Sequence, residues 1–350
     1  MKYINYALLI FAVLAVAGEI FHWPPVMIFF AAALGVVPMA GFMGRATEDL
    51  AIYTGPRLGG LLNATLGNAA ELIIAIVAIR EGLLRLVLAS ITGSILGNIL
   101  LILGLSMLLG GLKHGVQKFD RTQAGVNATM LILAVIALAI PSFFNFRIAD
   151  IDEASVEYLS LSTAVVMLAI YALGIIFSFK GASTQNEYAQ AHDHQPTWSR
   201  GLAIGVLVAA TLAIVVLSEI LVGAVEPVVE SLGISEFFLG IILIPLVGNV
   251  AEHVVAVQVA IKNKMELSLA ISIGSSLQIA LFVTPILVFV SLLMGNPLQL
   301  TFDQFEIVTM IGASLIAALI ALDGESNWLE GAQLLGVYLI IALAFFFLPS

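Results

Sequence analysis

Long apolar runs, separated by short polar stretches, fill most of the chain. A run of about eighteen apolar residues is long enough to cross a bilayer as a helix. Eleven such runs occur, at roughly residues 4–21, 26–44, 57–79, 83–111, 121–140, 156–179, 200–222, 235–262, 266–294, 305–322 and 327–348. The pattern predicts an all-α integral membrane protein with eleven transmembrane helices.

The composition agrees with a membrane protein and excludes several other classes. Of the 350 residues, 61% are hydrophobic and only 10% are charged, and the mean hydropathy is +1.11. Soluble domains do not have this balance. The net charge of −10 argues against nucleic acid as a partner. Because the chain has no cysteine, it has neither a disulfide framework nor a thiolate metal site.

The polar stretches between the apolar runs predict the boundaries of an N-terminal helix, two repeats and a linker. No small-residue cleavage site follows the first apolar run, so we interpret residues 1–22 as an uncleaved transmembrane helix. Residues 23–180 and 200–350 would each form a five-helix repeat, joined by a cytoplasmic linker at residues 181–199. The linker contains His192-Asp193-His194, which could bind a metal. A solvated loop is the favoured interpretation, since a flexible loop gives three ligands no scaffold.

The basic residues predict the orientation in the membrane, because cytoplasmic loops carry an excess of Lys and Arg. With a cytoplasmic N-terminus, the inner side holds Lys2, Arg45, Arg57, Lys113, Lys118, Arg121, Lys180, Arg200, Lys262 and Lys264. The outer side holds only Arg80, Arg85 and Arg147. We therefore expect a multi-pass protein of the cell (plasma) membrane whose N-terminus is cytoplasmic and whose C-terminus is extracytoplasmic.

The sequence repeats itself. Shifted by 181 positions, residues 58–100 align with 239–281 without a gap, and about 15 of roughly 43 positions are identical. The two copies start on the third and eighth predicted spans, so they must cross the membrane in opposite directions. This predicts inverted repeats, whose equivalent residues converge near the middle of the bilayer in transporters that work by alternating access.

Each copy places a glutamate in an apolar run. Glu71 follows Gly67 and Asn68, and Glu252 follows Gly248 and Asn249. A carboxylate in hydrocarbon costs about 2.5–3.5 kcal/mol on insertion scales, so two at matched positions are expected to have a function. Glycine lets backbone approach a ligand, and Asn and Glu three residues apart share a helix face. These groups predict a hard-oxygen cation site with Glu71 and Glu252 as metal ligands.

A second polar cluster follows each glutamate. Ser94 and Asn98 are four residues apart, and Ser275 and Gln278 are three apart, so each pair lies on one helix face. Small residues and serines also serve helix packing in membranes. Because the clusters recur beside the glutamate motifs, we favour a role in the cation and proton site.

Three further polar residues are candidates for the ion pathway. His253 follows Glu252 directly and could line the pathway, titrate or bond a neighbouring helix. Glu219 lies near the outer end of the seventh span. At this position we expect it in a vestibule or at the surface rather than in the central site. Glu48, at the inner end of the second span, could belong to a cytoplasmic cation funnel or simply face water.

The residues at 67–73, 248–253, 262–265 and 274–280 resemble those of the calcium/proton antiporter (CAX) family, within the cation/calcium exchanger superfamily. The similarity covers nearly the whole chain and suggests a prokaryotic member. The resemblance implies one N-terminal helix, two inverted five-helix repeats and Ca²⁺ export driven by proton entry. It also implies that Glu71 and Glu252 carry the cation and protons, assisted by Asn68, Asn249, Ser94, Ser275 and Gln278.

Other functions stay open at this point. The chain could exchange Na⁺ for Ca²⁺ or move Mn²⁺ or Cd²⁺, or it could be an acidic-site cation channel. An intramembrane enzyme is disfavoured because no nucleophile motif and no metal-binding His-x-x-x-His occur. We expect a transporter without a cofactor, whose partners are Ca²⁺, H⁺ and the lipid bilayer; a homo-oligomer is left open.

Overall fold

The structure of the chain is a computed structural model that describes residues 2–148, 153–180 and 196–348. Within these ranges the chain is almost wholly helical, with one pair of two-residue strands. Most of the predicted linker, including His192-Asp193-His194, lies outside the described residues.

The elements follow one another with short connections. In chain order they are α1 (Lys2–Ile20), α2 (Pro25–Thr54), α3 (Pro56–Leu66), α4 (Ala69–Arg80), α5 (Leu84–Leu96), η1 (Gly97–Ile102), α6 (Leu103–His114), β1 (Gln117–Lys118), α7 (Arg121–Ile148), α8 (Glu153–Lys180), α10 (Arg200–Gly223), α11 (Val225–Leu232), α12 (Glu236–Phe238), η2 (Leu239–Leu243), α13 (Ile244–Gly248), α14 (Val250–Ile261), α15 (Met265–Gln278), η3 (Ile279–Val283), α16 (Thr284–Met294), α17 (Gln304–Asp323), β2 (Glu325–Ser326) and α18 (Trp328–Phe347).

Many of these helices can span a bilayer. In the described ranges, eight continuous helices are long and apolar enough, and a ninth span results if residues 236–248 and 252–261, bent by 65°, are taken together. The prediction of an all-helical membrane protein is confirmed at this level. The second apolar run continues past residue 44, because α2 extends to Thr54 through helix-favouring Ala, Leu and Glu residues.

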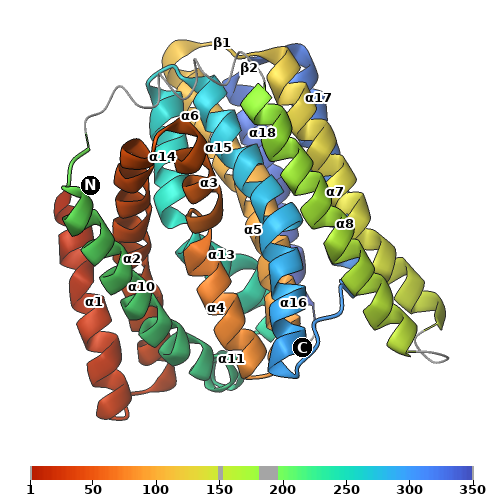
Figure 1. Cartoon of the computed structure of the whole chain (residues 1–350). Coiled ribbons are helices and arrows are strands. Elements are labelled where there is room, and N and C mark those ends of the chain that lie inside the picture. The colour runs from red at the N-terminus through yellow and green to blue at the C-terminus, as the bar shows by residue number, and fades with distance from the viewer. Residues whose placement is uncertain (1, 149–152, 181–195, 349–350) are drawn as a thin grey trace. The chain divides into compact units, whose positions relative to one another are not determined.

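The described chain divides into two compact units. Unit 1 comprises residues 1–77, 169–231 and 247–251. Its long helices α1, α2 and α10 lie side by side (Figure 1). Small residues allow this close approach. Ala40 of α2, Ala69 and Ala70 of α4, and Ala210 of α10 share one buried cluster, which also contains Met43. The N-terminus of α4 is thereby fixed against α2 and α10.

Unit 2 comprises residues 78–168, 232–246 and 252–350. Helix α5 packs on η2, α6 on α18, and α7 on α17. A Cβ atom at Gly93 would overlap the backbone carbonyl of Ile241, so only glycine permits this contact between α5 and η2. Strands β1 and β2 pair antiparallel, and Lys118 Nζ lies 3.1 Å from a carboxylate oxygen of Glu325.

Matched irregularities interrupt helices in both sequence copies. The first copy breaks after Leu66 and resumes at Ala69, and the second breaks after Gly248 and resumes at Val250. The π-helical segments η1 and η3 also fall at equivalent positions under the 181-residue offset, whereas η2 has no counterpart in α3. Such π-turns mark functional positions more often than chance.

Candidate functional site

The first glutamate lies just beyond a helix break. In unit 1, α3 ends at Leu66 and α4 starts at Ala69, so Glu71 occupies the first turn of α4. Glycine weakens the helix at this break, while Asn68 before it is 1% exposed. Ala70 packs toward α2 and α10. The break therefore puts a half-buried carboxylate where backbone groups are not all used by the helix.

The second sequence copy contributes directly to this glutamate. Asn249 Nδ2 donates a hydrogen bond to Glu71 Oε1, although the two residues are 178 positions apart. The amide of Asn249 is itself only 3% exposed. A Cβ atom at Gly248 would come within 2.8 Å of Glu71 Cγ, so glycine leaves the room that the Glu71 side chain occupies. Five predicted site residues, Gly67, Asn68, Glu71, Gly248 and Asn249, thus belong to unit 1.

The second glutamate has the equivalent position in unit 2. Glu252 lies in the first turn of α14, directly after the break at residue 249. The side chain of Ser275, on α15, hydrogen-bonds this carboxylate. Its Oε2 atom is buried and has no hydrogen-bond partner among the described residues. A buried carboxylate oxygen without a hydrogen-bond partner can accept a proton or coordinate a cation.

His253 pairs with an amide from the first sequence copy. His253 Nε2 lies 3.0 Å from Asn98 Oδ1, and both side chains are buried. Asn98 is held by the π-turn η1, and its Nδ2 atom has no partner in the described part of the chain. This contact connects the two copies within unit 2, as the Glu71–Asn249 bond does within unit 1.

The other predicted residues occupy varied surroundings. Ser94 on α5 is buried, and Gln278 at the end of α15 is half-buried. Of the glycines beside Ser94, Gly93 approaches backbone closely, whereas a Cβ at Gly97 would meet nothing within 4 Å. Close packing therefore explains Gly93. The pathway candidates Glu48 and Glu219 are both exposed, on α2 and α10 of unit 1.

One buried carboxylate was not among the predicted site residues. Glu306, at the start of α17, is fully buried in unit 2, and it accepts hydrogen bonds from Thr92 Oγ1 and from the backbone N–H of Asp303, each at 2.7 Å. The capping-box spacing from Asp303 to Glu306 was the available signal. Since these bonds account for Glu306 as a helix cap, it needs no role in transport.

A buried carboxylate next to Glu48 anchors the chain before α10. Asp49 on α2 is 4% exposed and accepts the backbone N–H groups of Thr197 and Trp198, each at 2.9 Å. The Arg45 guanidinium lies 5.5 Å from the centre of the Trp198 ring. These contacts fix the end of the linker region on α2 within unit 1. No local sequence pattern indicates this contact, because 148 residues separate Asp49 from Thr197.

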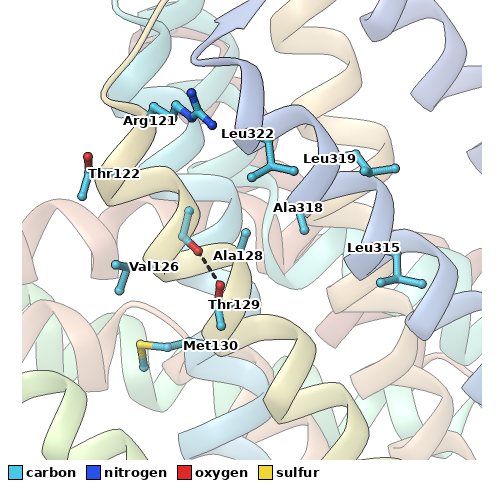
Figure 2. A pocket seen from close by; sticks show the side chains of 11 residues that line it. Arg121, Thr122, Val126, Ala128, Thr129, Met130, Leu315, Ala318, Leu319 and Leu322 are labelled. Carbon is cyan, nitrogen blue, oxygen red and sulfur yellow. Dashed lines mark hydrogen bonds between the residues drawn. The ribbon is translucent and has the colours of Figure 1, made fainter.

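A shallow groove between α7 and α17 does not fit a cation. Its lining residues are Arg121, Thr122, Gly125, Val126, Ala128, Thr129, Met130, Leu315, Ala318, Leu319 and Leu322. Figure 2 shows the mostly apolar lining side chains of α7 and α17, with Arg121 at one end. No carboxylate lines the groove, and none of the predicted site residues belongs to it.

Within the described ranges, the site motifs supply oxygen donors rather than a dense cluster of metal-binding side chains. Among the described residues, no three His, Cys, Asp or Glu side chains cluster in a way that could hold a metal ion. The site motifs instead supply carboxylate, amide and hydroxyl oxygens on interrupted helices, the ligand types preferred by hard cations. Interrupted membrane helices are typical of ion sites in secondary transporters.

The fold and these motifs define a helical membrane transporter with a carboxylate on each of two interrupted helices. The chain belongs to the sodium/calcium exchanger protein family, whose model matches residues 24–180 and 202–347. The resemblance found in the sequence is thereby confirmed.

Characterised relatives are similar along nearly their whole length. A protein of Aphanothece halophytica named Ca²⁺/H⁺ antiporter is 44% identical over 361 residues, covering 99% of this chain and 97% of the relative. The Ca²⁺/H⁺ antiporter ChaA of Bacillus subtilis (strain 168) is 44% identical over 340 residues, covering 96% of each chain.

Solved structures share the fold. Native YfkE superposes with a TM-score of 0.86 at 41% identity, covering 99% of this chain and 100% of the other. The H⁺/Ca²⁺ exchanger CAX has a TM-score of 0.74 over 99% of this chain and 92% of its own, at 18% identity, which shows the fold alone.

Proposed function

We propose that the chain is a secondary antiporter that exports Ca²⁺ in exchange for H⁺. The hydrogen bond from Asn249 to Glu71, which joins the two Gly-Asn-x-x-Glu motifs, carries the proposal. The names of the relatives from Aphanothece halophytica and Bacillus subtilis support the choice of ions. Neither Glu71 nor Glu252 has a nucleophile motif beside it, so the carboxylates bind ions rather than catalyse a reaction.

The proposed architecture has eleven spans in two inverted five-helix repeats, residues 23–180 and 200–350, after a helix in residues 1–22. Eleven is reached if the short apolar helix α1 and the broken pair α3–α4 each count as a span beside the nine continuous or bent ones. Helix breaks and π-turns at equivalent positions of both copies support the repeat.

The proposed site brings Glu71 and Glu252 together at the centre of the membrane. Chain connectivity supports this arrangement. Asn249 bonds Glu71 and precedes Glu252 by three residues, and three residues span at most about 11 Å even when fully extended. Asn68, Ser94, Asn98, Ser275 and Gln278 would add amide and hydroxyl oxygens, while His253 would line the pathway.

Coupling follows from competition for the same oxygens. A bare pair of carboxylates is costly in a nearly dry site, because burial and mutual repulsion both disfavour two charges. Protons or one Ca²⁺ can neutralise the pair, but not both at once. The pair therefore crosses the membrane carrying either Ca²⁺ or protons, with two protons per Ca²⁺ as the minimum ratio. In the plasma membrane, with the N-terminus cytoplasmic, inward proton flow then drives Ca²⁺ out.

Neutral variants of the carboxylates test the proposal. Glu71→Gln and Glu252→Gln should abolish Ca²⁺ uptake into inside-out vesicles that have an acidic interior, because an amide can neither release a proton nor neutralise Ca²⁺. Uptake of ⁴⁵Ca²⁺ measures this, with size-exclusion profiles to confirm folding. Glu266→Gln, on the exposed first turn of α15, is the matched control and should retain uptake.

Normal uptake by either glutamine variant would contradict the two-carboxylate site. The same vesicles distinguish other functions. Uptake driven by a Na⁺ gradient without a pH gradient would indicate a sodium/calcium exchanger, and Ca²⁺ flux without counter-movement of protons would indicate a channel.

A further inference from the structure

A row of buried hydroxyls runs along α15 in unit 2. Ser268, Ser272 and Ser275 follow one another at intervals of four and three residues, so they lie on one face of this helix. Their exposed fractions are 0%, 1% and 4%. At 1.5 Å per residue, the row is about 10 Å long.

The hydroxyls of Ser268 and Ser272 are not used by the helix itself. A serine in a membrane helix commonly donates to the carbonyl four residues earlier. Ser276 does so, with its Oγ atom 3.0 Å from the carbonyl oxygen of Ser272. By contrast, Ser268 Oγ and Ser272 Oγ have no hydrogen-bond partner among the described residues. Buried hydroxyls of this kind are normally satisfied by internal water.

One end of the row reaches the candidate site. Ser275 hydrogen-bonds the Glu252 carboxylate, whose buried Oε2 atom has no partner in the described part of the chain. The row therefore leads from Ser268 to a group that can accept a proton.

The other end of the row lies near the turn between α14 and α15. Lys262, Asn263 and Lys264 of this turn are exposed. Gln117 of β1 donates to Asn263 Oδ1 at 3.0 Å, and its own Oε1 atom is buried and unpartnered among the described residues. Elements β1 and α6 pack against α15. Ser106 of α6 adds another fully buried hydroxyl without a partner in the described ranges.

The row is present in only one sequence copy. Under the 181-residue offset, Ser268 and Ser272 correspond to the apolar residues Val87 and Ile91, whereas Ser275 corresponds to Ser94. Helix packing at these positions is thus compatible with apolar side chains. The two hydroxyls are an addition specific to the half that carries Glu252.

We propose that Ser268 and Ser272 hold a file of water molecules that conducts protons between the Lys262–Lys264 turn and the Glu252 end of the site. Each water molecule accepts a proton from the water on one side and donates a different proton to the water on the other side. For every O–H bond that forms, another breaks, so the net result is the movement of one positive charge along the file. Ca²⁺, which needs six to eight oxygen ligands, cannot follow a single line of hydroxyls. The inference deepens the proposed function and rests on it.

The experiment blocks the row without touching the carboxylates. Ser272→Val removes a hydroxyl and fills its space, Ser272→Thr restores a hydroxyl, and Ser276→Val places the same bulk at a neighbouring buried position as the matched control. In proteoliposomes containing a pH-sensitive dye, Ser272→Val should slow Ca²⁺-dependent proton flux about tenfold, a loss equivalent to ~1.4 kcal/mol of barrier. Ca²⁺ binding at fixed pH should stay unchanged, and the Thr variant should recover the flux.

Three results would each contradict the proposed water file. Wild-type proton flux in Ser272→Val, or equal slowing in Ser276→Val, would overturn it, as would a parallel loss of Ca²⁺ binding. If Ser272→Val does not fold, the smaller Ser268→Ala/Ser272→Ala double variant answers the same question. Wild-type protein that moves Ca²⁺ without protons would instead overturn the proposed function itself.

Discussion

At the scale of single residues, the second sequence copy shapes the surroundings of the first glutamate. Asn249 orients Glu71 through a hydrogen bond, and Gly248 leaves room for its side chain. A ligand held by a neighbouring amide keeps its geometry while the ion enters and leaves. The strict Gly-Asn order in the motif therefore has a physical reason in the partner glutamate, 177 residues before Gly248.

Gly248→Ala tests this dependence. The added methyl group would come within 2.8 Å of Glu71 Cγ and push the carboxylate aside. We expect the Ca²⁺ concentration for half-maximal transport to rise about 10–100-fold, the range found when the support of a metal ligand is lost. Gly312→Ala, where a Cβ would meet nothing within 4 Å, is the control and should transport normally. Unchanged transport by Gly248→Ala would contradict the prediction that transport depends on the space beside Glu71 that Gly248 leaves free.

The carboxylates of the proposed site should also set the response of Ca²⁺ binding to pH. In the proposed mechanism, protons and Ca²⁺ compete for the same oxygens, so acid should weaken Ca²⁺ binding and alkali should strengthen it. For each proton displaced, the apparent affinity can change by up to about tenfold per pH unit. Calorimetry in detergent between pH 5 and 8 measures the effect, with Glu71→Gln as the comparison. An affinity that stays flat over this range would contradict competition.

At the scale of elements, most candidate site residues lie at or beside helix breaks and π-turns rather than within regular helices. The sequence predicted most apolar spans to within a few residues, because hydrophobic runs of fixed length leave few alternatives in a membrane. It also indicated weak helix at Gly67 and Gly248. The π-turn at η1, which carries Asn98, has no sequence signature, because it depends on how the surrounding helices pack.

At Gly93, α5 packs so closely on η2 that there is no room for a side chain. Gly93→Ala would force a methyl group into the backbone of Ile241, separating α5 from η2. We expect a loss of about 1–3 kcal/mol of stability, as in other overpacked interiors, measured as a lower midpoint of thermal unfolding in detergent. Gly97→Ala, with open space around its Cβ position, should change stability by less than about 0.5 kcal/mol. Equal shifts in both variants would refute the contact.

At the scale of the whole molecule, the sequence predicted the family, but not the long-range contacts of its buried polar residues. The pairings of Glu71 with Asn249, His253 with Asn98 and Glu306 with Thr92 connect residues 155 to 214 positions apart. No local pattern encodes such pairings. The repeat predicted that equivalent motifs meet, whereas the cap on Glu306 and the anchor at Asp49 depend on the detailed packing of distant helices.

The absence of cysteine from the sequence makes the proposed orientation simple to measure. Single-cysteine variants Glu81→Cys and Lys262→Cys place a thiol at exposed turns on opposite predicted sides. A membrane-impermeant maleimide should label Glu81→Cys in intact cells or spheroplasts, and Lys262→Cys only in inside-out vesicles. The reverse labelling pattern would invert the topology, and labelling of both from one side would contradict the repeat.

The start of a new helix at each glutamate has a consequence for turnover. Glu71 and Glu252 lie in the first turns of α4 and α14, where the aligned peptide dipoles present a partial positive charge. That charge stabilises an ionised carboxylate and repels a bound divalent cation. A carrier must release its cargo in every cycle. At the proposed site, the broken helices would therefore lower the affinity for Ca²⁺ and speed its release.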